Sequence, residues 1–410
     1  MKTNTLILFA FFLLVFVSCN NDDDYETVNV ATAITMDVEA LRKSVDVLPP
    51  QEIRETGKIY VIGNLILVND AKEGVHLIDN SNPVSPTKIA FLKVLGSNDM
   101  EVKGDFLYVD SYMDLVVFDI SNLTEIKEVE RLKDVFPYYP PYPEEAGVVD
   151  YDSYPQDETS IVVGWDIRQE RRKIEDDRFL YMNDAAFSEN LASPQTGEGG
   201  SLARFKIVDD YLYAVDFNNI NIFDISNIQS PVAKDPVNAG FGIETIFNRG
   251  SHLFLGSTNG MYIFDISVPK TPNFISEFSH ATACDPVVVD GDYAYVTLRG
   301  GNFCGAIEST LRVIDISDVN NPIQKSSYTL EEPYGLGVRG NNLFVCDGKA
   351  GLKVFDKTGA PFVEFVENHE VEKAYDVIPL ANSLIMIGEG KLYQYNYEEG
   401  KLNLISEFQL

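Results

Sequence analysis

Short apolar segments separated by polar turns recur along most of this chain. The pattern is clearest in residues 279–325, where 287–289 and 293–296 have the composition of half-buried β-strands. Residues 290–292, Asp-Gly-Asp, lie between these two segments and are typical of a hairpin turn. Another apolar segment, 311–314, leads into a second turn that contains proline. The unit therefore predicts a small meander of β-strands.

The unit recurs, and each copy contains an apolar strand that ends at Asp. The closing residues are Asp79, Asp119, Asp224, Asp265, Asp315, Asp356 and, in a degenerate copy, Asn396. Successive residues of this set are 40, 105, 41, 50, 41 and 40 positions apart. The interval of 50 contains an enlarged loop, and the interval of 105 contains one period plus an insertion at about 134–200. A period near 40 with about four short strands per unit is typical of a β-propeller.

We therefore predict an all-β fold, a seven-bladed β-propeller over residues 58–410. Closing the ring would remove exposed sheet edges, which otherwise promote aggregation. The alternative, an open β-solenoid, requires shorter repeats of roughly 20–30 residues. The last unit carries its own outer strand at 402–410. Whether a strand at 25–31 also helps to close the ring stays open.

The first 19 residues have the pattern of a lipoprotein signal peptide. Lys2 supplies a positive charge, and the apolar run at 6–17 is too short to span a bilayer as a helix. Residues 16–19, Phe-Val-Ser-Cys, resemble a bacterial lipobox, which implies that Cys19 is acylated and becomes the new N-terminus. An ordinary signal peptide with an incidental cysteine is the alternative.

An acidic tether follows the cysteine. Residues 20–24, Asn-Asn-Asp-Asp-Asp, are similar to the surface-export signal of lipoproteins from Bacteroidetes, and a simple solvated tether is the alternative. We assign 20–57 to this tether and to a short helix. The helix is expected at 36–45, because Val38, Leu41 and Val45 are spaced to share one helical face.

The insertion is rich in aromatic and charged residues. Its first part contains several Pro and Tyr residues, which favour an extended path, and 166–180 is dense in charged helix formers, which predicts a short helix. Four aromatic residues are candidates for contact with sugar rings or with a protein surface, namely Tyr138, Tyr139, Tyr142 and Trp165. A lid that binds no ligand is the alternative.

The chain is strongly acidic, with a formal net charge of −31. Such a charge repels phosphate backbones, so we expect no nucleic-acid partner. Four acids stand just before the first strand of a unit, namely Asp99, Glu244, Asp285 and Asp376. On a propeller they would surround the mouth of the central channel and form a negative funnel that could hold Ca²⁺ or a basic group. A purely structural role for these acids is the alternative, and no other cofactor is expected.

We find no catalytic motif and assign no catalytic residue. The Asp-Ile-Ser turns recur in several units, whereas catalysis needs one asymmetric arrangement, so we interpret these acids as caps of backbone N–H groups. Cys284 and Cys304 flank two strands of one unit in a chain that carries an export signal. We therefore predict that they form a disulfide. Cys346 lies within a strand and is expected to be a buried apolar residue.

The phrases LVVFDISN, NIFDISN, YIFDIS and RVIDISD resemble the LVIVD repeat, a propeller-forming unit of secreted bacterial proteins. The longer phrases CDPVVVDGDYAYVTLRGG and YGLGVRGNNLFVCDGKAGLKVFD are similar to lipoproteins of Bacteroidetes that carry such repeats. The resemblance covers roughly residues 58–410. It implies a propeller in the cell envelope, and because the family has no assigned enzymatic activity, the resemblance points to no catalytic residues.

These observations favour a lipid-anchored binding protein that is exported by the Sec route, sits in the outer membrane and faces the cell surface. Its expected partners are the membrane, through the N-terminal lipid, and a protein or glycan ligand. An enzyme that processes glycans or small molecules at the central channel is one alternative, with His280 and Asp285 as its only local candidates. A structural subunit of an envelope complex is another.

Overall fold

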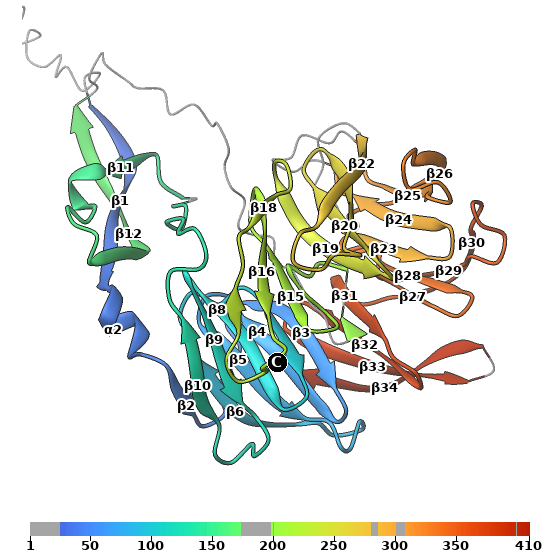
Figure 1. Ribbon diagram of the computed structural model, residues 1–410, viewed down its shortest axis with the longest axis horizontal. Coiled ribbons are helices and arrows are strands. Elements are labelled where there is room, and N and C mark those ends of the chain that lie inside the picture. Colours follow the sequence, from blue (N-terminus) through green and yellow to red (C-terminus); the bar gives the residue numbers. More distant parts are fainter. Residues whose placement is uncertain are drawn as a thin grey trace, which may run out of the picture. The chain divides into compact units, whose positions relative to one another are not determined.

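The computed structural model describes residues 25–143, 145–173, 198–199, 201–279, 286–300, 308–398 and 400–410. The chain divides into two compact units, which are described separately (Figure 1). The described part of the smaller unit comprises residues 25–37 and 140–173, and the larger unit comprises 38–139 and the described residues from 198 onward.

The larger unit consists of antiparallel sheets that follow one another along the chain (Figure 1). The first sheet contains β2 (Asp46–Leu48), β3 (Thr56–Ile62), β4 (Leu65–Asp70), β5 (Gly74–Asp79), β6 (Thr87–Lys93) and, beside β3, β13 (Glu198–Gly199). The second sheet contains β7 (Met100–Lys103), β8 (Phe106–Ser111), β9 (Asp114–Asp119) and β10 (Lys127–Leu132). The third sheet contains β14 (Phe205–Val208), β15 (Tyr211–Val215), β16 (Asn219–Asp224), β17 (Val232–Ala233) and β18 (Val237–Asn238).

The remaining sheets are meanders of four strands each. The fourth sheet contains β19 (Ile243–Arg249), β20 (His252–Ser257), β21 (Gly260–Asp265) and β22 (Asn273–Ser279). The fifth sheet contains β23 (Val287–Asp290), β24 (Tyr293–Leu298), β25 (Thr310–Asp315) and β26 (Ile323–Thr329). The sixth sheet contains β27 (Leu336–Arg339), β28 (Asn342–Cys346), β29 (Leu352–Asp356) and β30 (Glu364–His369). The seventh sheet contains β31 (Ala374–Pro379), β32 (Ser383–Gly388), β33 (Lys391–Glu398) and β34 (Lys401–Gln409).

Each sheet packs on its neighbour through a separate apolar cluster. Six clusters join successive sheets in chain order, because the middle strands of each sheet are apolar on both faces. A further cluster joins the seventh sheet to the first and includes Ile66, Val68, Ile385 and Leu392. An open solenoid would keep its first and last repeats apart, so that alternative is wrong. The all-β, propeller-like fold is confirmed. Seven blades stay a prediction, which the succession of described sheets supports.

Side chains close the ring, and the same kind of contact occurs between internal sheets. Ser406 Oγ of the seventh sheet donates to the carbonyl oxygen of Pro83 in the first sheet at 2.6 Å. Ser326 Oγ of the fifth sheet donates to the carbonyl oxygen of Pro361 in the sixth at the same distance. The amides of Asn80 and Gln394 add two reciprocal hydrogen bonds of 2.9 and 2.8 Å. The ring therefore closes without the exchange of a terminal strand.

The smaller unit is a three-stranded sheet. Its central strand is β1 (Tyr25–Asp37), which pairs antiparallel with β12 (Ser160–Lys173) and parallel with β11 (Val148–Asp150). The 3₁₀-helix η2 (Tyr151–Ser153) follows β11. Two expectations were therefore wrong. Residues 25–34 form a strand where a tether was expected, because Val, Thr and Ile recur along them. Residues 166–173 form a strand where a helix was expected, because pairing with β1 overrides their helical propensity.

The expected short helix forms as α2 (Val38–Arg42), within the larger unit. Leu41 is buried, and Arg42 binds Asp114 of β9 through two hydrogen bonds of 2.9 and 3.0 Å. Asp114 is fully buried and also accepts a hydrogen bond from Arg131 at 3.1 Å. This charge-assisted network holds the helix against the second sheet. No helix within the described ranges has both the length and the apolar character to cross a membrane.

Ring closure gives a direct test. We expect Gln394→Ala to lower the free energy of unfolding by about 1–3 kcal/mol, because the Asn80 amide loses its partner at a largely buried interface. Equilibrium unfolding in urea measures this change. The control Asn403→Ala alters an exposed amide on β34 and should change the free energy by less than about 0.5 kcal/mol. Equal effects of the two substitutions would contradict a closing role for Gln394.

Candidate functional site

The first strands of the sheets lie side by side at the centre of the larger unit. Contacts run from β3 through β7, β14, β19, β23 and β27 to β31. β13 pairs with β3 and also contacts β31, so it fills the position between the seventh and first sheets. The candidate acids before the first strands therefore come from elements that meet at the centre.

Strand pairing shows which residues are equivalent around this centre. The equivalent positions, in the order of the sheets, hold Lys58, Asp99, Arg204, Thr245, Pro286, Gly335 and Asp376. Because the seventh sheet adjoins the first, four residues with ionisable side chains follow one another, acid and base in turn: Asp376, Lys58, Asp99 and Arg204. We call these four residues the charge belt. The expected ring of four acids does not form in the described residues, since a bulge in β19 puts Thr245 at the position expected for Glu244.

Lys58 and Asp99 make a buried ion pair at the middle of the charge belt. Lys58 Nζ lies 2.5 Å from Asp99 Oδ2, and each side chain is 1% exposed. The same carboxylate oxygen accepts hydrogen bonds from the backbone N–H groups of Arg204 at 2.6 Å and Phe205 at 2.7 Å. Burial lowers the pKa of Lys58 to about 8, although the attraction of Asp99 opposes this shift. The pair thus ties the first, second and third sheets together.

Asp376 is buried at the other end of the charge belt. Its side chain is fully enclosed, and neither carboxylate oxygen has a hydrogen-bond partner among the described residues. Burial raises the pKa of Asp376 well above its usual range. Gly335 on the neighbouring sheet makes the room for it, because a Cβ at this position would lie 2.0 Å from Asp376 Oδ1. Asp376 is therefore a buried, packed residue and not a solvent-facing acid, and its burial favours the neutral form.

Glu101 on β7 extends this buried cluster. It is 3% exposed, and burial raises its pKa to about 8, a shift that the positive charge of Lys206 partly offsets. The backbone N–H of Ile207 donates to Glu101 Oε1 at 3.4 Å. No pattern in the sequence had marked this residue. Its sequence signal is a charged residue between two apolar residues, Met100 and Val102, of a short strand.

The chain itself fills the centre of the larger unit. Ser201, Leu202 and Ala203 are buried, and Ser201 Oγ accepts a hydrogen bond from the backbone N–H of Leu336 in the sixth sheet at 2.8 Å. Together with β13, these residues contact the first, sixth and seventh sheets before β14 begins. Asp99 and Asp376 consequently cannot reach a ligand from solvent in this structure.

Several other predicted residues can be located, and others cannot. Glu244 is half-buried on β19. Cys346 is a buried free thiol whose pKa burial raises, as expected for an apolar core residue. Tyr138 and Tyr139 belong to the larger unit, whereas Tyr142 and Trp165 belong to the smaller unit. Four candidates lie outside the described residues, namely Cys19, Asp285, Cys284 and Cys304, so the predicted lipid and disulfide stay predictions.

The repeated turn acids have the structural role that was expected. Asp224, Asp265 and Asp315 each accept a hydrogen bond from the backbone N–H of the serine two residues later, at 2.8 to 3.1 Å. Together with a hydrogen bond from the serine hydroxyl, these bonds lower the pKa of Asp224 and of Asp315 to about 2. Such local caps account for the repetition of Asp-Ile-Ser without any catalytic role.

A second set of acids with a structural role was not predicted from the sequence. Asp70, Asp110 and Asp347 stand at or just after the end of a second strand, and each accepts two backbone N–H groups from the loop before the first strand of the same sheet. Asp347 also pairs with Lys353 of β29 at 2.5 Å. The recurring acid after an apolar second strand was the signal in the sequence that could have identified them.

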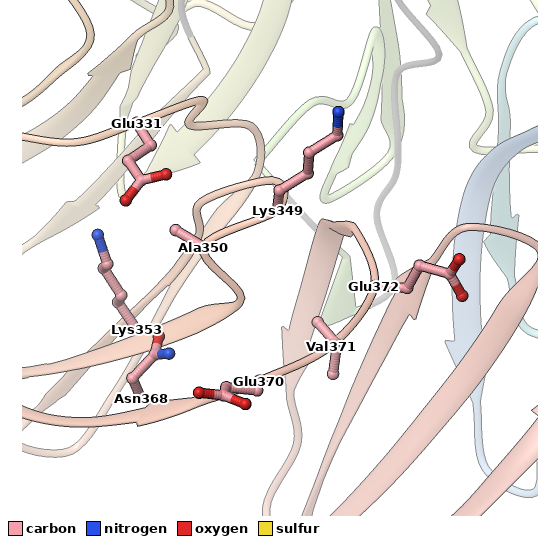
Figure 2. A pocket seen from close by; sticks show the side chains of 8 residues that line it. All are labelled: Glu331, Lys349, Ala350, Lys353, Asn368, Glu370, Val371 and Glu372. Atoms are coloured by element: carbon pink, nitrogen blue, oxygen red, sulfur yellow. The ribbon is translucent and has the colours of Figure 1, made fainter.

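An open groove of about 700 Å³ lies on loops of the sixth and seventh sheets (Figure 2). It is lined by Glu331, Lys349, Ala350, Lys353, Asn368, Glu370, Val371 and Glu372. Four of these charged side chains have no ion pair or side-chain hydrogen bond within the described ranges, namely Glu331, Lys349, Glu370 and Glu372. The volume is within the usual range of ligand sites. The groove is thus a polar surface of mixed charge whose hydrogen-bonding groups are available to a partner.

Gly348 fixes one wall of the groove. Its φ of 52° lies in the left-handed region, and a Cβ there would come within 2.9 Å of Glu332. Its carbonyl oxygen accepts a hydrogen bond from the backbone N–H of Ala374 at 2.9 Å. The loop between β28 and β29 is therefore held against both neighbouring loops.

In the part of the chain that the structure describes, no group of three or more His, Cys, Asp or Glu residues is placed to hold a metal ion. Ca²⁺ binding stays a prediction.

This closed succession of antiparallel sheets defines a propeller-like repeat protein. Four segments match the family model of the LVIVD repeat, namely residues 53–90, 96–134, 199–239 and 282–330. The chain therefore carries LVIVD repeats, as its Asp-Ile-Ser phrases had indicated. They coincide with the first, second, third and fifth sheets.

Solved structures show a similar fold at low sequence identity. A protein from Lactobacillus plantarum is 12% identical, with a TM-score of 0.54 over 85% of this chain and 98% of that one. The computationally designed protein Ika8 is 10% identical, with a TM-score of 0.51 over 87% of each chain. A comparison with curated protein sequences gave no match. At these identities the likeness concerns the fold alone.

The buried cluster predicts a pH dependence. In the folded state Glu101 keeps its proton up to a pKa of about 8, whereas the unfolded chain releases it near 4.5. Its contribution to stability is therefore complete below about pH 4.5 and is lost as the pH rises to 8. The slope from this one group can reach about 1.4 kcal/mol per pH unit. Because Gln cannot ionise, Glu101→Gln should remove that slope.

Urea unfolding at several pH values between 4.5 and 8 measures the effect. The control Glu389→Gln alters an exposed residue of the seventh sheet and should leave the pH profile of the wild type unchanged. A Glu101→Gln profile that runs parallel to that of the wild type would show that Glu101 is ionised in the folded protein.

Proposed function

We propose that this chain is a lipid-anchored binding protein of the bacterial cell envelope. Export by the Sec route and acylation of Cys19 would hold it in the outer membrane, with the propeller at the cell surface. The pattern of residues 1–19 and the acidic run at 20–24 support this location. The resemblance to lipoproteins of Bacteroidetes supports it further. More than one acyl chain would give stable anchoring, where a single chain gives only marginal binding.

One observation carries the binding role: the centre of the larger unit is filled, while the groove on its loops is open. Asp99 and Asp376 are enclosed by protein and are used within it. The charged side chains of the groove are instead available to a partner (Figure 2). A rigid ring that presents a polar, mixed-charge groove suits recognition of a partner that carries both charges.

The alternative enzymatic role would need an accessible pair of catalytic groups. The candidates for that role, His280 and Asp285, lie outside the described residues, whereas the turn acids bind backbone N–H groups. No further observation favours that alternative. A structural subunit of an envelope complex would use the same exposed loops, and it differs from a receptor in having a permanent protein partner.

The lipid anchor can be tested in cells that express the full chain. With Cys19→Ser we expect metabolic labelling by an alkyne analogue of palmitate to disappear, because the thiol that accepts the lipid is absent. We also expect the protein to move from the membrane fraction to the soluble fraction. Cys346→Ser is the matched control, since that thiol is buried and should not affect labelling. Labelling that persists in Cys19→Ser would refute the anchor.

The groove can be tested by charge reversal. We expect Lys349→Glu together with Glu372→Lys to reduce, by tenfold or more, the recovery of an envelope component that the wild type captures from solubilised membranes. A tenfold loss of affinity corresponds to about 1.4 kcal/mol of binding free energy, which we attribute to the loss of complementary charge pairs. Lys401→Glu on β34 provides a control at an exposed position outside the groove. Equal recovery by both variants would show that the partner binds elsewhere.

A further inference from the structure

The smaller unit carries a row of aromatic rings that no catalytic or anchoring role explains. Tyr151 of η2 lies next to Tyr154, with ring centroids 5.7 Å apart and an interplanar angle of 23°. Tyr154 lies next to Trp165 of β12, with centroids 5.6 Å apart. Tyr151 is 59% exposed, while Tyr154 and Trp165 are half-buried. We call these three residues the aromatic row.

The backbone around the aromatic row is fixed by hydrogen bonds. Trp165 Nε1 donates to the carbonyl oxygen of Pro141 at 2.6 Å, which fixes the indole ring. Ser153 Oγ accepts from the backbone N–H of Ala33 at 2.8 Å, next to the bulge of β1. The Asp150 carboxylate caps η2 by accepting from the N–H of Asp152. The rings are therefore held in place before any ligand arrives, which reduces the entropic cost of binding.

The charges beside the aromatic row select the kind of ligand. Residues 145–166 contain six acidic residues and no basic residue, whereas the arginines in the described part of this unit stand at 168, 171 and 172, after Trp165 on β12. Nucleobases can stack on aromatic rings, but their phosphates would meet this negative surface unfavourably. Anionic polysaccharides would be disfavoured for the same reason. An uncharged ligand with apolar faces and many hydroxyl groups meets no such repulsion.

We propose that the aromatic row binds a neutral glycan. The C–H bonds on the face of a pyranose carry partial positive charge, and the faces of Tyr and Trp rings are negative, so the two surfaces attract each other. Successive sugar rings of one chain can follow successive aromatic rings. The exposed carboxylate of Asp152, beside Tyr151, is placed to accept hydrogen bonds from sugar hydroxyls. Of this row, only Trp165 was predicted from the sequence as a contact residue. Tyr151 and Tyr154 were missed, because the loop that brings them to β12 is a tertiary feature.

This inference goes beyond the proposed function and does not depend on the lipid or on the groove. A protein partner could also use Tyr and Trp residues, since both are common at interfaces. The aromatic row favours the glycan, because acidic residues flank it and a neighbouring carboxylate can accept hydrogen bonds from sugar hydroxyls. Binding of neutral oligosaccharides, compared with capture of an envelope protein, separates the two kinds of partner.

Trp165 is the only tryptophan in the chain, so its fluorescence reports directly on the aromatic row. We expect at least one of three neutral oligosaccharides, cellohexaose, chitohexaose and maltohexaose, to change the emission of the full chain in a saturable manner. Tyr151→Ala should weaken that binding by about tenfold, because it removes one exposed stacking surface. The control Tyr25→Ala removes a ring of similar exposure (48%) in the same unit and should leave the affinity unchanged.

Three results would overturn the proposal. The first is the absence of any saturable change with all three oligosaccharides in the millimolar range. The second is equal affinity of Tyr151→Ala and Tyr25→Ala, which would put the ligand away from the row. The third is capture of an envelope protein that depends on Tyr151 while the oligosaccharides give no signal, which would make the row a protein interface. Far-ultraviolet circular dichroism of each variant shows that the fold is retained.

Discussion

Closing the ring requires the seventh sheet to present to the first the same surface that each sheet presents to its successor. An apolar cluster meets this requirement, and Ser406 repeats toward Pro83 the hydrogen bond that Ser326 makes to Pro361. The middle strands then have both of their apolar faces covered, which explains why they are buried in all of these sheets. The repeats remain similar because each must fit two neighbours.

The centre of the ring brings together one residue from each sheet, so a charged residue there lies close to residues from the neighbouring sheets. Lys58 pairs with Asp99, and Asp99 also accepts from the backbone N–H groups of Arg204 and Phe205, which offsets part of the cost of burying these two charges. Breaking such a pair is expensive, because the remaining charge stays buried without its partner. The charge belt therefore restricts which sheets can be neighbours. The surfaces that we propose for recognition lie away from the centre, namely the groove on the loops and the aromatic row of the smaller unit.

Much of the fold could be predicted from residue patterns alone. The spacing of the closing Asp residues predicted the repeat, and the recurrence of Asp-Ile-Ser predicted its structural role, because both depend on local turn chemistry. Of the acids predicted to form a funnel, Asp99 and Asp376 are buried, and Asp285 lies outside the described residues. Asp99 and Glu244 look alike in the sequence, but the bulge in β19 changes the register and with it the face on which a residue lies. The insertion was also misjudged, since β12 looks helical by its composition.

The sequence by itself determined the module: strands, turns and caps arise from neighbours within about 40 residues. Only the tertiary structure decided what lies at the centre, which loops form the groove and which aromatic rings meet in the smaller unit. Lys58 and Asp99 are 41 positions apart, and Asp99 and Arg204 are 105 apart, yet they make one cluster. Contacts of that kind depend on how whole sheets pack, and no local pattern encodes the packing partner.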